Sequence, residues 1–149
     1  MVWIIIISFL VIVIGKFFWD RYKMEQKIKQ EGGMSKKYAT LINLILAQDR
    51  EARVLHETPS DISMGLESTS GKILINILAT FKSITITYFL DSYLVGKHKL
   101  QWEFDKDEDQ QYMNDKMNKD IGAYMDNINF EDKLQKGIGK VMEKYFKED

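Results

Sequence analysis

The residues best placed for chemistry are acidic and lie between positions 105 and 109. Asp105, Asp107 and Asp109 stand at alternate positions, as the first ligands of a calcium-binding loop do. The rest of such a loop is missing, because its sixth position is Gln110 instead of glycine and its twelfth is Lys116 instead of glutamate. Acidic residues also gather where a helix begins, because they cap it and complement its dipole. We therefore predict helix capping, and an enzyme that uses a metal at this run is the less favoured hypothesis.

The two histidines, His56 and His98, have no partners at metal-ligand spacing. His56 is followed by Glu57, Ser60 and Asp61, which are the residue types of a hydrolytic triad. A triad depends on geometry, however, and adjacent residues of a strand point to opposite faces. The chain has no cysteine, and no glycine pattern in it matches a phosphate-binding loop. We therefore predict no catalytic, cofactor-binding or metal-binding residues, and a protein that is not an enzyme.

Composition indicates one folded domain. The chain has 149 residues, of which 45% are hydrophobic and 29% charged, as is usual for globular proteins. The net charge is −1, so we expect no nucleic-acid binding through bulk charge. Residues 34–149 are numerous enough to bury a single hydrophobic core.

The strongest functional signal is the N-terminal run MVWIIIISFLVIVIG, in which only Ser8 and Gly15 interrupt the apolar residues. A helix needs about 20 residues to cross the hydrocarbon core of a bilayer. Residues 1–19 therefore predict a short transmembrane anchor. On that helix Trp3 and Trp19 would lie roughly 24 Å apart, a spacing that suits the two membrane interfaces. The expected membrane-interface residues are Trp3, Lys16, Phe17, Phe18 and Trp19.

Charge predicts the orientation of this anchor. Basic residues favour the cytoplasmic side, and here they follow the apolar run: Lys16, Arg21, Lys23, Lys27 and Lys29. We therefore expect the N-terminus outside and the C-terminal domain in the cytoplasm, at a bacterial inner membrane. The opposite orientation, a eukaryotic organelle membrane, a cleaved signal peptide and a buried core helix are the competing interpretations. The last two are disfavoured because the run lacks a basic start and is not amphipathic.

The remainder of the chain predicts an α+β fold. Residues 20–33 should form a helical stalk that ends at a Gly32-Gly33 hinge, and residues 34–149 a soluble domain. The first helix of this domain is expected from Ser35 to Gln48, where apolar residues recur at helical spacing.

After Ala52 the apolar period changes to two, which predicts strands. Their connections are short, so neighbouring strands must be antiparallel, and we expect a meander of four or five strands. The expected strands are 53–57, 61–67, 72–80, 83–90 and 98–104. Two C-terminal helices should follow. Asp107 with Gln110 resembles a capping box for the first, and the second begins after Asn129.

The C-terminal helices carry the residues that we favour for partner binding. Flexible methionines suit adaptable surfaces as well as cores; for the methionines core filling is the favoured role and a partner groove the alternative. The candidates are Met113, Met117, Tyr124, Tyr145 and Phe146. The last helix is amphipathic, so its expected docking surfaces are the sheet, a protein partner and the membrane surface, and its charges of both signs disfavour the membrane.

These features predict a single-pass, membrane-anchored, non-enzymatic interaction or assembly module on the cytoplasmic face. Its partners would be the lipid bilayer and either another protein or further copies of the chain. The competing hypothesis is a ligand- or lipid-binding sensor domain at the membrane surface. That hypothesis predicts an apolar cavity between the sheet and the C-terminal helices.

Overall fold

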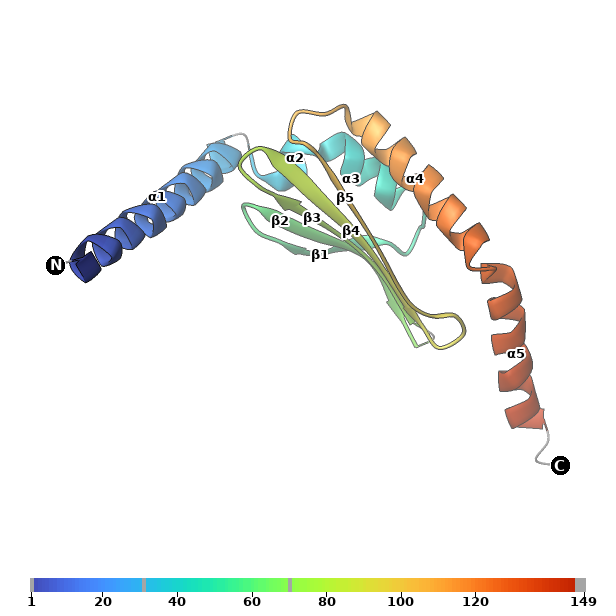
Figure 1. Ribbon diagram of the computed structural model, residues 1–149. Coiled ribbons are helices and arrows are strands. Elements are labelled where there is room, and N and C mark those ends of the chain that lie inside the picture. The colour runs from blue at the N-terminus through green and yellow to red at the C-terminus, as the bar shows by residue number, and fades with distance from the viewer. Residues whose placement is uncertain (1, 31, 70, 147–149) are drawn as a thin grey trace.

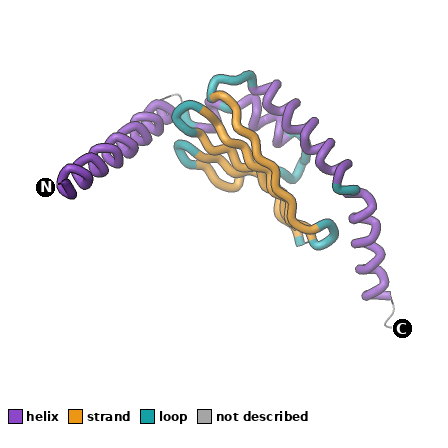
Figure 2. Tube along the Cα trace, viewed as in Figure 1, coloured by secondary structure: helices purple, strands orange, loops and turns teal. Residues whose placement is uncertain are grey.

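A computed structural model shows one antiparallel sheet with helices packed on one face and a long helix at each end of the chain (Figure 1). It describes residues 2–30, 32–69 and 71–146, without the side chains of residues 2–6, 8, 145 and 146. The helices are α1 (Val2–Gln30), α2 (Met34–Lys37), α3 (Ala39–Leu46), α4 (Gln110–Asn127) and α5 (Phe130–Phe146). The predicted α+β class is confirmed, as the succession of helices and strands in Figure 2 shows.

The sheet is a five-stranded meander in which each strand pairs with the next along the chain. Its strands are β1 (Arg53–Glu57), β2 (Asp61–Ser68), β3 (Gly71–Ala79), β4 (Ser83–Ser92) and β5 (Gly96–Asp105). All four pairings are antiparallel. Antiparallel order follows from the short turns, which leave no room for a parallel crossover.

Alternation along the strands separates a core face from an open face. One row across the sheet joins Ile62, Ile77, Ile86 and Trp102 through the strand register. The first three of these side chains are fully buried. Because successive side chains of a strand point to opposite sides, the intervening residues such as Thr85 lie on the open face.

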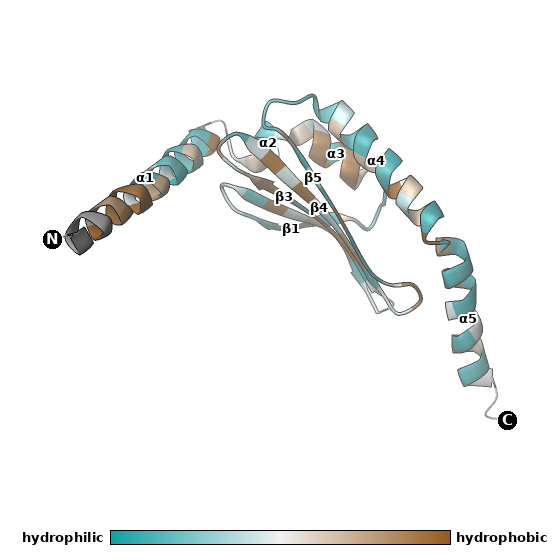
Figure 3. Cartoon of the chain, in the orientation of Figure 1, coloured by the Kyte–Doolittle hydropathy of each residue, from teal (hydrophilic) through white to brown (hydrophobic). Residues whose placement is uncertain are grey.

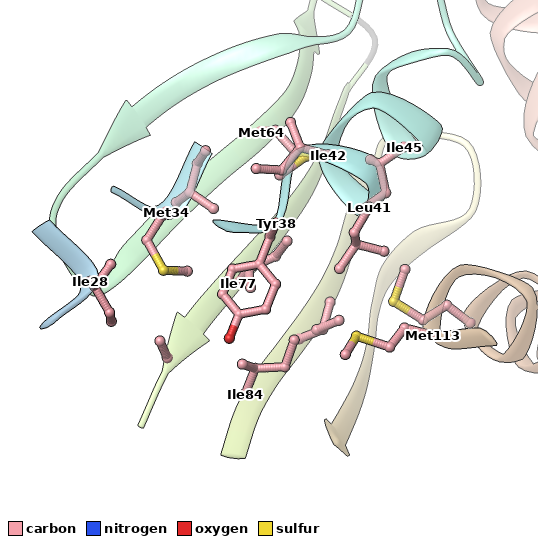
Figure 4. Close-up of a cluster of buried hydrophobic side chains, with 14 residues drawn as sticks. Ile28, Met34, Tyr38, Leu41, Ile42, Ile45, Met64, Ile77, Ile84 and Met113 are labelled. Carbon is pink, nitrogen blue, oxygen red and sulfur yellow. The ribbon is translucent and has the colours of Figure 1, made fainter. Parts of the chain in front are cut away.

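Two hydrophobic clusters fill the space between the sheet and the helices. The first joins α2, α3 and the start of α4 to β2, β3 and β4, and includes Leu41, Ile84 and Met113 (Figure 4). The second joins the end of α4 and the start of α5 to β4 and the β4–β5 turn, and includes Leu90 and Val95. Burying this apolar surface is the main force that holds the helices on the sheet.

The helix predicted from Ser35 to Gln48 is divided at Tyr38, where the backbone leaves helical geometry (φ −108°, ψ 29°). In a continuous helix the Leu41 N–H would donate to the Lys37 carbonyl. The carboxamide of Gln110 fills this gap instead. Its Nε2 donates to the Lys37 carbonyl at 3.0 Å, and its Oε1 accepts from the Leu41 N–H at 2.9 Å.

The predicted capping box of Asp107 with Gln110 is therefore wrong, because the Gln110 side chain is engaged by the α2–α3 break. The N-cap of α4 is Asp109, whose Oδ1 accepts from the Tyr112 N–H at 2.8 Å. The general expectation that this acidic run caps a helix is confirmed at that residue.

Replacing Gln110 by alanine should lower the free energy of unfolding by about 1–3 kcal/mol, because a part-buried backbone donor loses its acceptor. The neighbouring Gln111 provides the control, since its side chain bonds only to exposed Asp115 on the same helix. Gln111→Ala should change stability by less than about 0.5 kcal/mol. Denaturant unfolding of the two variants measures the difference, and equal losses would contradict the role given to Gln110.

Helix α1 runs without interruption from the apolar run into the predicted stalk and ends at Gln30, shortly before Gly32-Gly33. Gly33 N–H donates to the Ile28 carbonyl at 2.8 Å and Gly32 N–H to the Lys29 carbonyl at 3.1 Å. Both glycines have positive φ, so this pair of bonds is a Schellman turn. Ile28 is buried in the first cluster, which attaches the end of α1 to the domain. Whether the turn also acts as a hinge stays a prediction.

Among the residues that the structure describes, none of the helices is both long enough and apolar enough to cross a membrane. The domain boundaries 1–19, 20–33 and 34–149 stay predictions.

Candidate functional site

The acidic run and the residues around His56 do not form a site in the part of the chain that is described. No three His, Asp or Glu side chains there come close enough together to hold a metal ion. Asp105 accepts from the Asp107 N–H at 3.1 Å, as in a turn before a helix. Glu57 is occupied by Ser35, whose hydroxyl donates to Oε2 at 2.7 Å and whose N–H donates to Oε1 at 3.0 Å.

His98 has a structural position between β5, the β4–β5 turn and α4. Its Nε2 lies 3.0 Å from the Val95 carbonyl, which can only accept, so Nε2 carries the proton. The other ring nitrogen then accepts from the Tyr124 hydroxyl at 3.0 Å when His98 is neutral. Tyr124, one of the candidate contact residues, is thus half-buried and tied to the sheet.

A second polar link joins α4 to the sheet. Lys116 and Trp102 both donate to Oδ2 of Asp120, the indole at 2.8 Å. These two hydrogen bonds stabilise the carboxylate and hold the pKa of Asp120 below its usual value. The Trp102 bond ties α4 to β5, whereas the Lys116 bond lies within α4.

The other candidate contact residues fall into two groups. Met113 and Met117 are 0% and 2% exposed, so their thioethers fill the core, which was the favoured role for the methionines. The side chains of Tyr145 and Phe146, at the end of α5, lie outside the described residues.

Helix α5 is docked on the domain only along its first half. Phe130 and Leu134 pack into the second hydrophobic cluster. Gly137 lies so close to the β4–β5 turn that a Cβ there would be 2.8 Å from the Leu94 carbonyl oxygen. The later part of α5 extends past the sheet (Figure 1), although Val141 still borders a cleft with Tyr93 and Val95, and Ile138, Val141 and Met142 are 45–53% exposed. We call these three residues the exposed α5 face.

The sequence pattern did not locate this exposed face. Phe130, Leu134, Ile138, Val141 and Met142 recur at steps of three and four, as along one buried stripe. Only the extent of the sheet decides where the stripe stops being covered. Gly137, which lies close to Leu94 of the β4–β5 turn, stands at the boundary between the covered and the exposed part of the stripe.

Helix α1 is exposed along most of its apolar length. It projects from the end of the sheet opposite to α5, and Figure 3 shows hydrophobic residues along its outer half and polar residues near the domain. The outer residues with large exposed side chains are Ile7, Phe9, Leu10, Val11, Ile12, Val13, Ile14, Phe17, Phe18 and Trp19. We call these residues the exposed α1 segment. Nearer the domain, Met24 and Ile28 pack on the core.

The predicted membrane-interface residues lie where this segment meets the domain. Lys16, Phe17, Phe18 and Trp19 are exposed in succession on α1, whereas the side chain of Trp3 lies outside the described residues. The Nζ of Lys23 lies 5.8 Å from the centre of the Trp19 ring, within range of a cation–π contact. After Trp19 the next basic residues, Arg21 and Lys23, follow within about one turn of helix.

Exposed apolar side chains therefore gather at the two ends of the molecule, in the exposed α1 segment and the exposed α5 face. Both consist of apolar side chains on helices that extend beyond the sheet (Figure 1). Comparison of the chain with protein-family models, with curated proteins and with solved structures found no match that could assign these surfaces.

Proposed function

We propose that this chain is a single-pass, membrane-anchored, non-enzymatic assembly module. In this proposal α1 holds the chain in the bilayer and the exposed α5 face joins it to a second copy. The observation that carries the proposal is the pair of apolar helix segments that project from opposite ends of one packed domain (Figure 1).

The exposed α1 segment supports the anchor. A surface helix of a soluble protein has one apolar stripe, whereas this segment is apolar at consecutive positions from Phe9 to Ile14 and hence on all sides. So large an exposed apolar surface is characteristic of a membrane or protein contact. The sequence extends the same run through residues 2–6, which brings the apolar length close to what a bilayer needs.

The position of the charges supports a cytoplasmic domain. Lys16 lies near the end of the exposed α1 segment, and Arg21, Lys23 and Lys27 follow it along α1 before the sheet begins. Basic residues beside a membrane span favour the cytoplasmic side. We therefore propose a domain on the cytoplasmic face, with the bacterial inner membrane as the favoured location.

The exposed α5 face supports assembly between copies. Three side chains cover much less than the roughly 1,000 Å² that a stable interface needs in solution. Anchoring in a common membrane compensates for this, because it confines the helices to a thin layer and raises their effective concentration. A weak apolar contact can then hold two copies together.

Cysteine cross-linking in vesicles tests the assembly, because the natural chain has no cysteine to interfere. Val141→Cys should give a cross-linked dimer under mild oxidation. Ala123→Cys, which is exposed on α4, is the matched control and should give at least about tenfold less, since a 1.4 kcal/mol preference already corresponds to that ratio. Adding Met142→Glu should abolish the dimer at Val141→Cys.

Equal cross-linking at positions 141 and 123 would mean random collision and would overturn the proposal. A cross-link from Val141→Cys to a different protein in native membranes, with none between copies, would show that the exposed α5 face binds that protein instead of a second copy. Absence of both products would show that the exposed α5 face takes no part in assembly.

A ligand- or lipid-binding sensor domain is the second candidate. Side chains such as Ile84 and Met113 are fully buried between the sheet and the helices. Two clefts lie instead at the surface, where α1 meets the sheet. These clefts support that junction as the binding site in the second candidate function.

A further inference from the structure

Two adjoining clefts lie where α1 leaves the domain. The larger, about 420 Å³, is bordered by Phe17 and Arg21 of α1 and by the β3–β4 turn. The smaller, about 190 Å³, lies one turn further along α1. Met24 and Phe81 line both clefts, which are therefore adjacent, and we call the pair the junction cleft.

The smaller part of the junction cleft is strongly basic. Lys23, Lys27 and Lys106 line it together with Lys37, which makes a further interaction of its own, and its described lining residues include no acid. Among the described acids, Asp107 lies 4.0 Å from the Lys106 Nζ and Asp20 borders the larger part. Like charges that converge on one cleft repel each other and are stabilised by an anion.

The apolar lining of the junction cleft specifies what kind of anion fits. Phe81, at the tip of the β3–β4 turn, is 61% exposed although it is a large aromatic residue. Met24, Ile28 and Leu78 continue the apolar surface on either side. A ligand with an anionic group and an apolar part matches this combination, whereas a small soluble anion leaves Phe81 in water.

The junction cleft also lies at the depth of a lipid headgroup if α1 is the anchor. Lys23 and Lys27 follow Trp19 by about 6 and 12 Å along the helix axis, given a rise of 1.5 Å per residue. The headgroup layer extends about 5–8 Å beyond the hydrocarbon core on each side. Interfacial tryptophan therefore places Lys23 within the headgroup layer, whereas the Lys27 backbone lies about 4–7 Å beyond it and its long side chain reaches back toward the headgroups.

We propose that the junction cleft binds one anionic phospholipid from the bilayer that holds α1. The phosphate lies among Lys23, Lys27 and Lys106, and the glycerol and upper acyl chain contact Met24 and Phe81. This inference rests on the proposed anchor. It gives the β3–β4 turn a function in holding the domain against the membrane surface.

Lipid binding to the full chain in a neutral detergent, after removal of native lipid, tests the proposal. Native mass spectrometry counts the bound molecules with phosphatidylglycerol, with phosphatidylcholine of the same chains and with glycerol 3-phosphate. We expect one tightly bound phosphatidylglycerol, which binds at least about tenfold more tightly than either of the others. Each basic residue near an anionic headgroup contributes about fivefold to affinity.

The triple variant Lys23→Gln, Lys27→Gln, Lys106→Gln should therefore bind phosphatidylglycerol on the order of a hundredfold more weakly. The control changes Lys133, Lys136 and Lys140 to glutamine, because these three lysines line a different cleft beside α5. The control removes the same net charge and should leave the bound lipid in place. Phe81→Ser should weaken lipid binding while the charge is unchanged.

Each remaining outcome is decisive. Equal loss in the triple variant and its control would show a bulk charge effect and overturn the site, as would equal affinity for the two lipids. Binding of glycerol 3-phosphate as tight as that of phosphatidylglycerol would assign the cleft to a soluble ligand. Failure of the anchor is separate from these results, because the wild-type chain would then not remain with washed membranes.

Discussion

Replacing Val11 and Ile12 together by aspartate should move the full chain from the membrane to the soluble fraction. Each charged residue near the centre of a spanning helix costs about 2.5–3.5 kcal/mol. The two substitutions together therefore reduce partitioning into the bilayer by a factor on the order of a thousand or more. Fractionation of cells after a carbonate wash measures the effect, which we expect to be the largest of any substitution in α1.

Val11 and Ile12 are exposed and belong to neither hydrophobic cluster, so replacing them should not unfold the domain. The thermal unfolding of the domain in the double variant should accordingly match that of the wild type. Val11→Ile with Ile12→Val keeps the segment apolar and should leave the chain in the membrane. If the aspartate variant also stays in washed membranes, α1 is not the anchor.

Replacing Gly65 by alanine should lower the free energy of unfolding by more than about 3 kcal/mol, which is a large part of the stability of a small domain. Gly65 lies in β2 with φ 152°, and a Cβ there would be 2.0 Å from the carbonyl oxygen of Ile73. That oxygen belongs to the backbone of β3, so it cannot move without breaking the ladder between β2 and β3. Chemical unfolding of the chain in a neutral detergent measures the loss.

Gly122→Ala is the matched control, since Gly122 lies on α4 and a Cβ there meets nothing within 4 Å. In a helix, alanine is favoured over glycine by roughly 0.5–1 kcal/mol. The same chemical change should therefore stabilise one site and strongly destabilise the other. A Gly65→Ala variant as stable as the wild type would mean that β2 and β3 are further apart than they are here.

Local patterns in the sequence accounted well for the strands. The observed strand ends differ from the predicted ones by two residues at most. Alternation such as Ile84, Ile86 and Tyr88 against Thr85 and Thr87 reports directly which face is buried, because side chains of a strand alternate. Short turns then leave only the antiparallel meander.

Helix ends and breaks were less predictable, because they depend on partners far away in the chain. The apolar stripe from Tyr38 to Leu46 is continuous, yet the helix divides at Tyr38, where Gln110 completes the interrupted hydrogen bonds. Gln110 is 69 residues from Leu41. No local pattern contains that contact, so the sequence could suggest only the local use of Gln110 in a capping box.

The two candidate surfaces also differ in how well the sequence alone predicts them. Apolar residues at consecutive positions in α1 predict an anchor without reference to the fold, because no packing against one sheet can cover every side of a helix. Met113, Met117 and Val141, in contrast, share the same helical spacing. Two of them are core residues and one is exposed, because α4 lies over the sheet and α5 extends past it. The sequence alone thus determined which segments are apolar and how their strands pair, since these depend on neighbours along the chain. Only the tertiary structure decided which apolar residues stay uncovered and which lysines converge on Phe81, because both depend on where distant elements meet.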